Sequence, residues 1–243
     1  MLNLRTVSAG LACLMMVSVS QAQLNSIRTE TGTSALMSQT LNYQNVTAKK
    51  VVARVSEENN NEKQLDVGDF DNDGDLDAVM AISLDAFGQR RNKLWRNDNG
   101  VMTEISGTNA IPGFSTRDNS RTAFLRDYDS DGWLDIIVIN DSNSGGTAGR
   151  TKYFSNKHVN GVFSHYVEES SRLNGATGAA CDGESADFNN DGTPDLYLGN
   201  YPFNSQDYLG FNDGTGNFTT VTSSHVPNDT DYTVDIAVMD LNP

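Results

Sequence analysis

The chain has 243 residues, in which 17 Lys and Arg stand against 32 Asp and Glu, for a formal net charge of −15. This length is enough for one domain with a substantial hydrophobic core. The excess of acid argues against nucleic acid and against anionic membrane surfaces as partners, because both need clustered Lys and Arg.

The first 22 residues have the pattern of a secretory signal peptide. Residues 7–19 are mostly apolar and small, and Ser20 and Ala22 place small residues at −3 and −1, so we predict cleavage after Ala22. A membrane-spanning helix needs about 20 apolar residues, and this run is too short. We therefore predict that the protein is secreted, periplasmic or on the cell surface, with no membrane span. A lipoprotein signal at Cys13 is the weaker alternative, because apolar sequence continues past the cysteine.

The segment that follows, residues 23–63, is polar and uneven. Residues 46–55 could form one or two strands, but no role follows from the sequence. Without the signal peptide, Cys181 is the only cysteine, so no intramolecular disulfide can form. We expect Cys181 to be a small buried residue, and we expect metal ions to cross-link the fold.

An unusual density of acid follows, in the nine residues D-F-D-N-D-G-D-L-D that begin at Asp69. Carboxylates packed this tightly repel one another unless a cation lies among them. Acids at positions 1, 3 and 5 can converge on one ion, Gly at position 6 permits a sharp turn, and position 7 offers its backbone carbonyl. An EF-hand would close with Glu at position 12 between two helices. Here an Asp closes at position 9 and an apolar, strand-like run follows, so we predict a calcium loop between two strands.

The same nine-residue pattern occurs three times, which makes a chance match improbable. Position 2 is aromatic in every copy (Phe70, Tyr128, Phe188), as if one ring packs beneath each loop. We predict about one Ca²⁺ for each loop. The predicted ligand residues are Asp69, Asp71, Asp73, Asp75 and Asp77 in the first loop, Asp127, Asp129, Asp131, Trp133 and Asp135 in the second, and Asp187, Asn189, Asp191, Thr193 and Asp195 in the third.

A period of about 60 residues runs through the chain from residue 64. The loops begin at residues 69, 127 and 187, and each precedes a second landmark, in which apolar or aromatic residues and an Asn are followed by a turn with Gly. The landmark asparagines are Asn97, Asn156 and Asn212. Each unit has room for four short strands joined by turns, which is typical of β-propeller blades. No stretch has a convincing helical pattern, so we predict an all-β fold.

The last residues continue the same pattern. Residues 233–239 look like the strand that precedes a further loop, and residues 240–243 fit the first four positions of that loop. We therefore predict a partial β-propeller over residues 64–243, with three blades and the first strand of a fourth, as a fragment of a longer protein. An alternative is that strands in 23–63 join 233–239 in a shared fourth blade. Open blade edges would favour self-association.

With these motifs the chain resembles FG-GAP/VCBS repeat proteins, the calcium-loop β-propeller family that includes integrin α-subunit heads. The resemblance covers about 64–243 and rests on the repeated DxDxDGxxD loop, which the run G-D-F-D-N-D-G-D-L-D follows closely. The Phe-Gly and Gly-Ala-Pro elements that name the family match poorly. The resemblance implies calcium in the loops and a binding or adhesive scaffold, and it carries over no integrin ligand contact.

Two functions remain open at this point. The first is a secreted calcium-binding scaffold for adhesion or for recognition of an extracellular protein or glycan. The second is the N-terminal propeller part of a larger carbohydrate- or lipid-active enzyme. We favour a non-enzyme, because the sequence has no zinc-site spacing of His, no GxSxG elbow and no phosphate loop. Asp66, Asp182 and Glu184 could act as acid or base, but support of the neighbouring loops is the simpler expectation.

Overall fold

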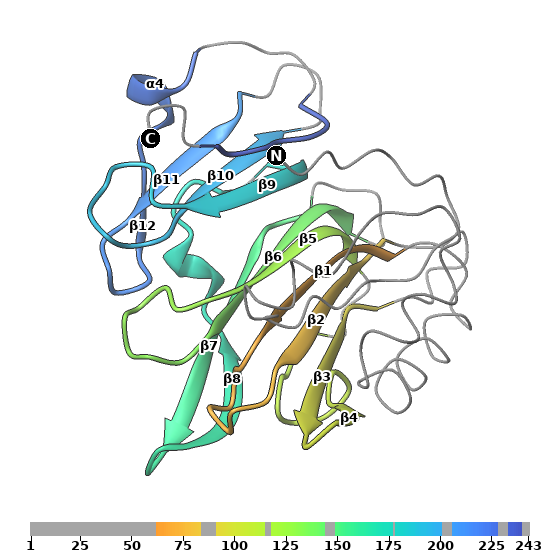
Figure 1. Cartoon of the computed structure of the whole chain (residues 1–243). Coiled ribbons are helices and arrows are strands. Elements are labelled where there is room, and N and C mark those ends of the chain that lie inside the picture. Colours follow the sequence, from red (N-terminus) through yellow and green to blue (C-terminus); the bar gives the residue numbers. More distant parts are fainter. Residues whose placement is uncertain are drawn as a thin grey trace, which may run out of the picture.

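Three four-stranded antiparallel sheets make up the fold of the computed structural model (Figure 1). The structure describes residues 62–83, 91–114, 118–143, 149–176, 178–200, 206–227 and 233–239. The first sheet contains β1 (Glu62–Gly68), β2 (Asp77–Ile82), β3 (Lys93–Asp98) and β4 (Val101–Glu104). The second contains β5 (Asp118–Arg126), β6 (Asp135–Asn143), β7 (Lys152–Val159) and β8 (Val162–Glu168). The third contains β9 (Ala180–Ala186), β10 (Asp195–Asn200), β11 (Tyr208–Asn212) and β12 (Phe218–Thr220).

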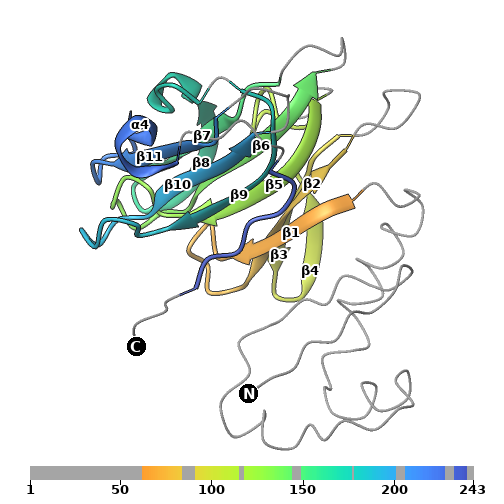
Figure 2. The same ribbon diagram turned by 90° about the horizontal axis from the view of Figure 1, so that it is seen from above.

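In each sheet the strands are hydrogen-bonded in the order of the sequence, so each repeat is a meander. The prediction of an all-β fold built from four-stranded, blade-like units is confirmed. The three acidic loops join the first strand of each sheet to the second, and they follow one another along one side of the molecule (Figure 1). Seen from above, the sheets stack side by side as in a partial propeller (Figure 2).

The second strand of each sheet is its most buried element, and β2 is buried at every position. β6 shows why, because its side chains alternate between two faces. Ile136 and Val138 belong to the hydrophobic core between the first and second sheets, whereas Ile137 and Ile139 belong to the core between the second and third. A strand buried on both faces reads as a continuous apolar run. The repeats therefore share their cores with their neighbours.

Residues 233–239 correct one expectation, because the structure assigns them no regular strand. They nevertheless lie along the third sheet. The backbone N–H of Ile236 donates to the Asp182 carboxylate at 2.9 Å, and the N–H of Thr233 donates to the Asn200 carbonyl at 3.3 Å. A blade has its first strand at this place, but no strand pairs with 233–239 within the described part of the chain.

Helix is limited to short pieces, among them η2 (Ser170–Arg172) and α4 (Thr222–His225). No helix among the described residues is long and apolar enough to cross a membrane. The predicted signal peptide and residues 23–61 lie outside the described residues, and β1 begins at Glu62, just before the predicted start of the repeats.

Candidate metal centre

The three loops share one backbone shape, which their sequence pattern dictates. Position 4 has φ near +60° in each, at Asn72 (56°), Ser130 (60°) and Asn190 (60°). Position 6 is Gly in each, with φ of 96°, 86° and 90°. Residues with a Cβ rarely adopt these values, whereas Gly does so freely. The two left-handed residues fold the chain back on itself, so that side chains at positions 1, 3 and 5 face a common point.

The acid at position 1 closes the turn through the backbone. In the first loop, Asp69 accepts the N–H of Asp73 at 3.1 Å and that of Gly74 at 2.9 Å. Asp187 makes the same two bonds in the third loop, at 3.1 and 2.9 Å. Position 1 therefore serves the loop geometry, because its carboxylate holds the backbone of positions 5 and 6 in the turn.

The acid at position 9 is buried and joins the loop to the third strand. Asp77 accepts the backbone N–H of Phe70 at 2.9 Å and that of Asn97 at 2.8 Å. Asp135 and Asp195 make the equivalent bonds in their own repeats. Burial raises the pKa of Asp77 and of Asp135 to about 7, and it also raises the pKa of Asp195. These closing acids therefore carry a structural role that the spacing alone did not indicate.

Two groups of three acids converge among the described residues. They are Asp69, Asp71 and Asp73 in the first loop, and Asp127, Asp129 and Asp131 in the second, with one oxygen from each acid within 4.8 Å of the others. One carboxylate oxygen of Asp71, of Asp127 and of Asp129 is buried without a hydrogen-bond partner. An unpartnered buried anionic oxygen is costly. A cation at the point of convergence would meet these oxygens, so the residues fit a metal ion.

The electrostatics of the first two loops agree with their geometry. Burial, followed by the charges of Asp73 and Asp69, raises the pKa of Asp71 to about 6. Burial, followed by the charge of Asp131, raises the pKa of Asp129. Both residues stand at position 3, in the middle of the acidic group. At position 3 the ionised form is therefore disfavoured unless a counter-charge is nearby.

The third loop differs at this same position, where Asn189 replaces the acid. The side chain of Asn189 accepts the N–H of Asp191 at 2.9 Å and donates to the Asp191 carboxylate at 2.7 Å. The Thr193 hydroxyl donates to Asp191 at 2.6 Å. The hydrogen bonds from Thr193, and then that from Asn189, lower the pKa of Asp191. In this loop the carboxylate of Asp191 therefore receives its hydrogen bonds from residues of the loop itself.

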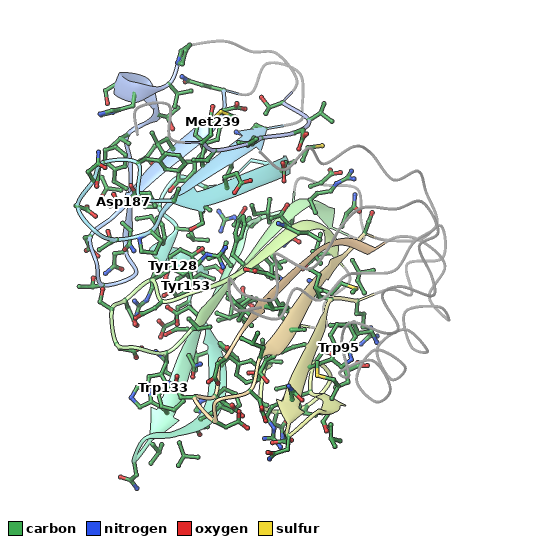
Figure 3. The ribbon with its side chains drawn as sticks, in the orientation of Figure 1. Trp95, Tyr128, Trp133, Tyr153, Asp187 and Met239 are labelled. Carbon is green, nitrogen blue, oxygen red and sulfur yellow. The ribbon has the colours of Figure 1, made fainter. Side chains whose placement is uncertain are left out.

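At position 7, the side chains of Asp75 and Trp133 have partners outside the convergent acids, whereas Thr193 bonds to an acid of its own loop. Asp75 accepts the backbone N–H of Asn99 at 2.6 Å, and Trp133 stacks on His158 with ring centroids 4.6 Å apart (the loop that bears Trp133 is in Figure 3). Thr193 bonds to Asp191, as described above. That position 7 offers an ion its backbone carbonyl stays a prediction.

The aromatic rings at position 2 pack between repeats. Phe70 contacts Phe163 and Tyr166 of β8, at centroid distances of 5.1 and 5.8 Å. Tyr128 lies between Tyr153 and the third sheet, as Figure 3 shows, and its ring also meets Phe218 of β12 at 5.7 Å. The expectation of a ring beneath each loop therefore extends to a contact with the next repeat.

Phe188 is the exception among these rings. It is half-buried, and its ring contact is with Tyr197 of its own sheet, at 6.3 Å. The strand that would cover it by analogy is the fourth strand of a following repeat, which the described chain does not contain.

Three acids expected to support the loops have other surroundings. Asp66 of β1 accepts the N–H of Leu125 at 2.9 Å and the Arg126 guanidinium at 2.7 Å. Asp182 of β9 accepts the Thr122 hydroxyl at 2.9 Å. Burial, followed by the charge of Asp182, raises the pKa of Glu184. Asp66 and Asp182 therefore join the first strands of neighbouring repeats.

The comparison with known families agrees with the repeat seen in the fold. A profile of the FG-GAP-like repeat matches the chain three times, over residues 69–138, 127–198 and 187–243. Each match begins at the first Asp of an acidic loop, and together they cover most of the chain. A search among curated proteins found no significant match.

Proposed function

Because the chain belongs to the FG-GAP-like repeat family, we propose that it is an exported repeat scaffold, stabilised by calcium, for adhesion or recognition of a protein or glycan. Repeats of this family generally form non-catalytic scaffolds. The observation that carries the calcium proposal is the pair of three-acid groups, with one unpartnered buried carboxylate oxygen in the first and two in the second.

The donor set favours a hard cation. The groups that converge in the first two loops are carboxylate oxygens, and a backbone carbonyl at position 7 would add a further oxygen. Ca²⁺ takes six to eight such oxygen ligands in flexible geometry, whereas structural Zn²⁺ prefers Cys and His. When bound, Ca²⁺ would supply the positive charge that lets neighbouring carboxylates remain ionised side by side. The residues themselves fix the turn, hold the acids in place and tie the loop to its sheet.

The energetic consequence follows from linkage. An ion that binds the folded form, and not the unfolded one, stabilises the protein as its concentration exceeds Kd. Calcium modules outside the cell typically have Kd values of about 10⁻⁴ to 10⁻³ M. At a concentration ten times Kd, each site would contribute about 1.4 kcal/mol to the free energy of unfolding.

The test is thermal unfolding of the full chain in calcium and in chelator. We expect calcium to raise the melting temperature by several degrees. The double substitution Asp71→Asn and Asp129→Asn should remove most of this rise. Glu168→Gln is the control for charge, because Glu168 is exposed on β8, outside the loops, and its substitution removes one negative charge, as each of the two loop substitutions does. A melting temperature that calcium does not change would refute the proposed role.

Export is tested separately, by N-terminal sequencing of protein recovered outside the cytoplasm. Cleavage after Ala22 predicts a chain that begins at Gln23. A mature protein that begins at Met1, or at a lipid-modified Cys13, would contradict the proposed route.

A further inference from the structure

The landmark asparagines occupy the same place in each repeat, near the end of the third strand. Their backbone N–H groups donate to the closing acid of their own loop at 2.8 Å in all three repeats. Their side-chain amides donate to the carbonyl at position 8 of the same loop, at 3.1, 3.1 and 3.2 Å. The residues are Asn97 of β3, Asn156 of β7 and Asn212 of β11.

Two of these asparagines make a further bond that crosses to the preceding repeat. The amide of Asn156 donates to the carbonyl of Phe70 at 2.8 Å, and the amide of Asn212 donates to the carbonyl of Tyr128 at 2.8 Å. An amide has two N–H donors, so one serves the loop of its own repeat and the other serves the loop before it. Both asparagines are 2 % exposed, which shields these bonds from water.

The accepting carbonyl lies at a sensitive point of the loop. It belongs to position 2, between the acids at positions 1 and 3, and its peptide bond runs directly into position 3. Because a peptide unit is planar, a hydrogen bond to the Phe70 carbonyl also restrains the backbone that carries Asp71. The ring of Phe70 is held by β8 of the same neighbouring repeat. The second repeat therefore contacts the first loop through both the backbone carbonyl and the ring of Phe70.

We propose that Asn156 and Asn212 are positioning residues that couple calcium binding in one loop to the docking of the next repeat. This inference rests on the proposed calcium function and adds how neighbouring sites communicate. Coupling of this kind is reciprocal. Docking of the second repeat raises the calcium affinity of the first loop, and calcium in the first loop strengthens that docking. The third repeat acts on the second loop in the same way through Asn212.

The experiment isolates the first loop in the full chain. Asp129→Asn and Asp191→Asn weaken the second and third loops, so that the first dominates calorimetric titration with calcium. In this background we expect Asn156→Ala to weaken calcium binding about threefold to tenfold, the effect of losing one buried hydrogen bond that positions a ligand.

Asn212→Ala is the matched control in that background. It removes the same amide and the same kind of bond between repeats, but at the joint that serves the second loop. We expect it to leave the first loop's affinity unchanged within twofold. If both asparagines contributed only to general stability, the two substitutions would change the first loop's calcium affinity equally.

The reverse arrangement provides a second test. In a chain with Asp71→Asn and Asp191→Asn, the second loop dominates, and Asn212→Ala should now weaken binding whereas Asn97→Ala should not. Equal effects of the paired variants in both backgrounds, or no effect in either, would overturn the coupling while leaving calcium binding in place. If neither of the two doubly substituted chains nor the wild type binds calcium, both proposals are overturned.

Discussion

The second and third loops have the same turn and different chemistry. Both place a left-handed residue at position 4 and Gly at position 6. In the second loop, Asp129 at position 3 has a buried oxygen without a partner and a raised pKa. In the third, Asn189 at that position hydrogen-bonds to Asp191, whose pKa is lowered. The second loop, with a carboxylate at position 3, therefore has a buried oxygen without a hydrogen-bond partner. The third loop, with an amide there, provides its own acid with a hydrogen bond.

The two loops also differ in what covers them. The ring of Tyr128 is fully buried between the second and third sheets, and its carbonyl accepts the amide of Asn212. Phe188 is half-buried. A repeat that follows in the structure thus completes the surroundings of the loop before it. We therefore expect a loop's calcium affinity to depend on its own acids and on the repeat that follows it.

The largest expected effect concerns this packing between repeats. Phe70→Ala empties a fully buried site and should lower the free energy of unfolding by about 3–5 kcal/mol. Phe188→Ala removes the same side chain from a half-buried site and should cost about 1 kcal/mol. Chemical denaturation in saturating calcium measures both values. Equal losses of stability would contradict the difference in packing, because they would mean that Phe188 is as well covered as Phe70.

The next prediction restores the missing acid. Asn189→Asp gives the third loop the same five key positions as the second, so its calcium affinity should rise, by about tenfold at low ionic strength, because ligand charge is one main control of affinity. Asp71→Asn should move the first loop in the opposite direction. Competition with a chelator of known affinity measures the shifts. Unchanged affinities in both variants would show that the acid at position 3 does not determine the order of calcium affinity among the loops.

A smaller effect should be equal in the two loops. Gly132→Ala and Gly192→Ala each place a Cβ on a residue with φ near 90°, which strains the backbone although space around the Cβ is open. Each should lower the free energy of unfolding by about 1–2 kcal/mol. Gly107→Ala is the control, since it also has open space but lacks a left-handed φ. Unequal costs at the two loops would show that their turns are not equivalent.

The smallest expected effect is a pH dependence of the metal-free protein. The pKa values of Asp71, Asp77 and Asp135 are raised to about 6, 7 and 7 in the folded state, so the folded form binds protons more readily than the unfolded form. Stability in chelator should therefore rise as the pH falls from 7.5 to 5.5. We expect a gain of a few degrees in melting temperature, which calcium should abolish. A melting temperature in chelator that falls over this range would contradict the raised pKa values.

Local patterns allowed much of this fold to be predicted. The loop spacing, the position of Gly and the apolar runs after each loop depend on neighbours in sequence, and the sheets follow them. The bonds of Asn156 and Asn212 to the preceding repeat span 86 and 84 residues, and no local pattern specifies such partners. The sequence marked these asparagines as landmarks of a turn, which is only part of their role. Residues 233–239 are β-prone, but a strand also needs a partner to pair with.

Calorimetric titration of the metal-free wild type with calcium is the most direct test of metal binding in the three loops. We expect calcium binding at low ionic strength with the first loop tightest, the second next and the third weakest, because they contain five, four and three acids. The weakest site should be the one that responds to Asn189→Asp. Three equal sites would contradict the ranking, and the absence of any binding heat together with an unchanged melting temperature would contradict calcium binding itself.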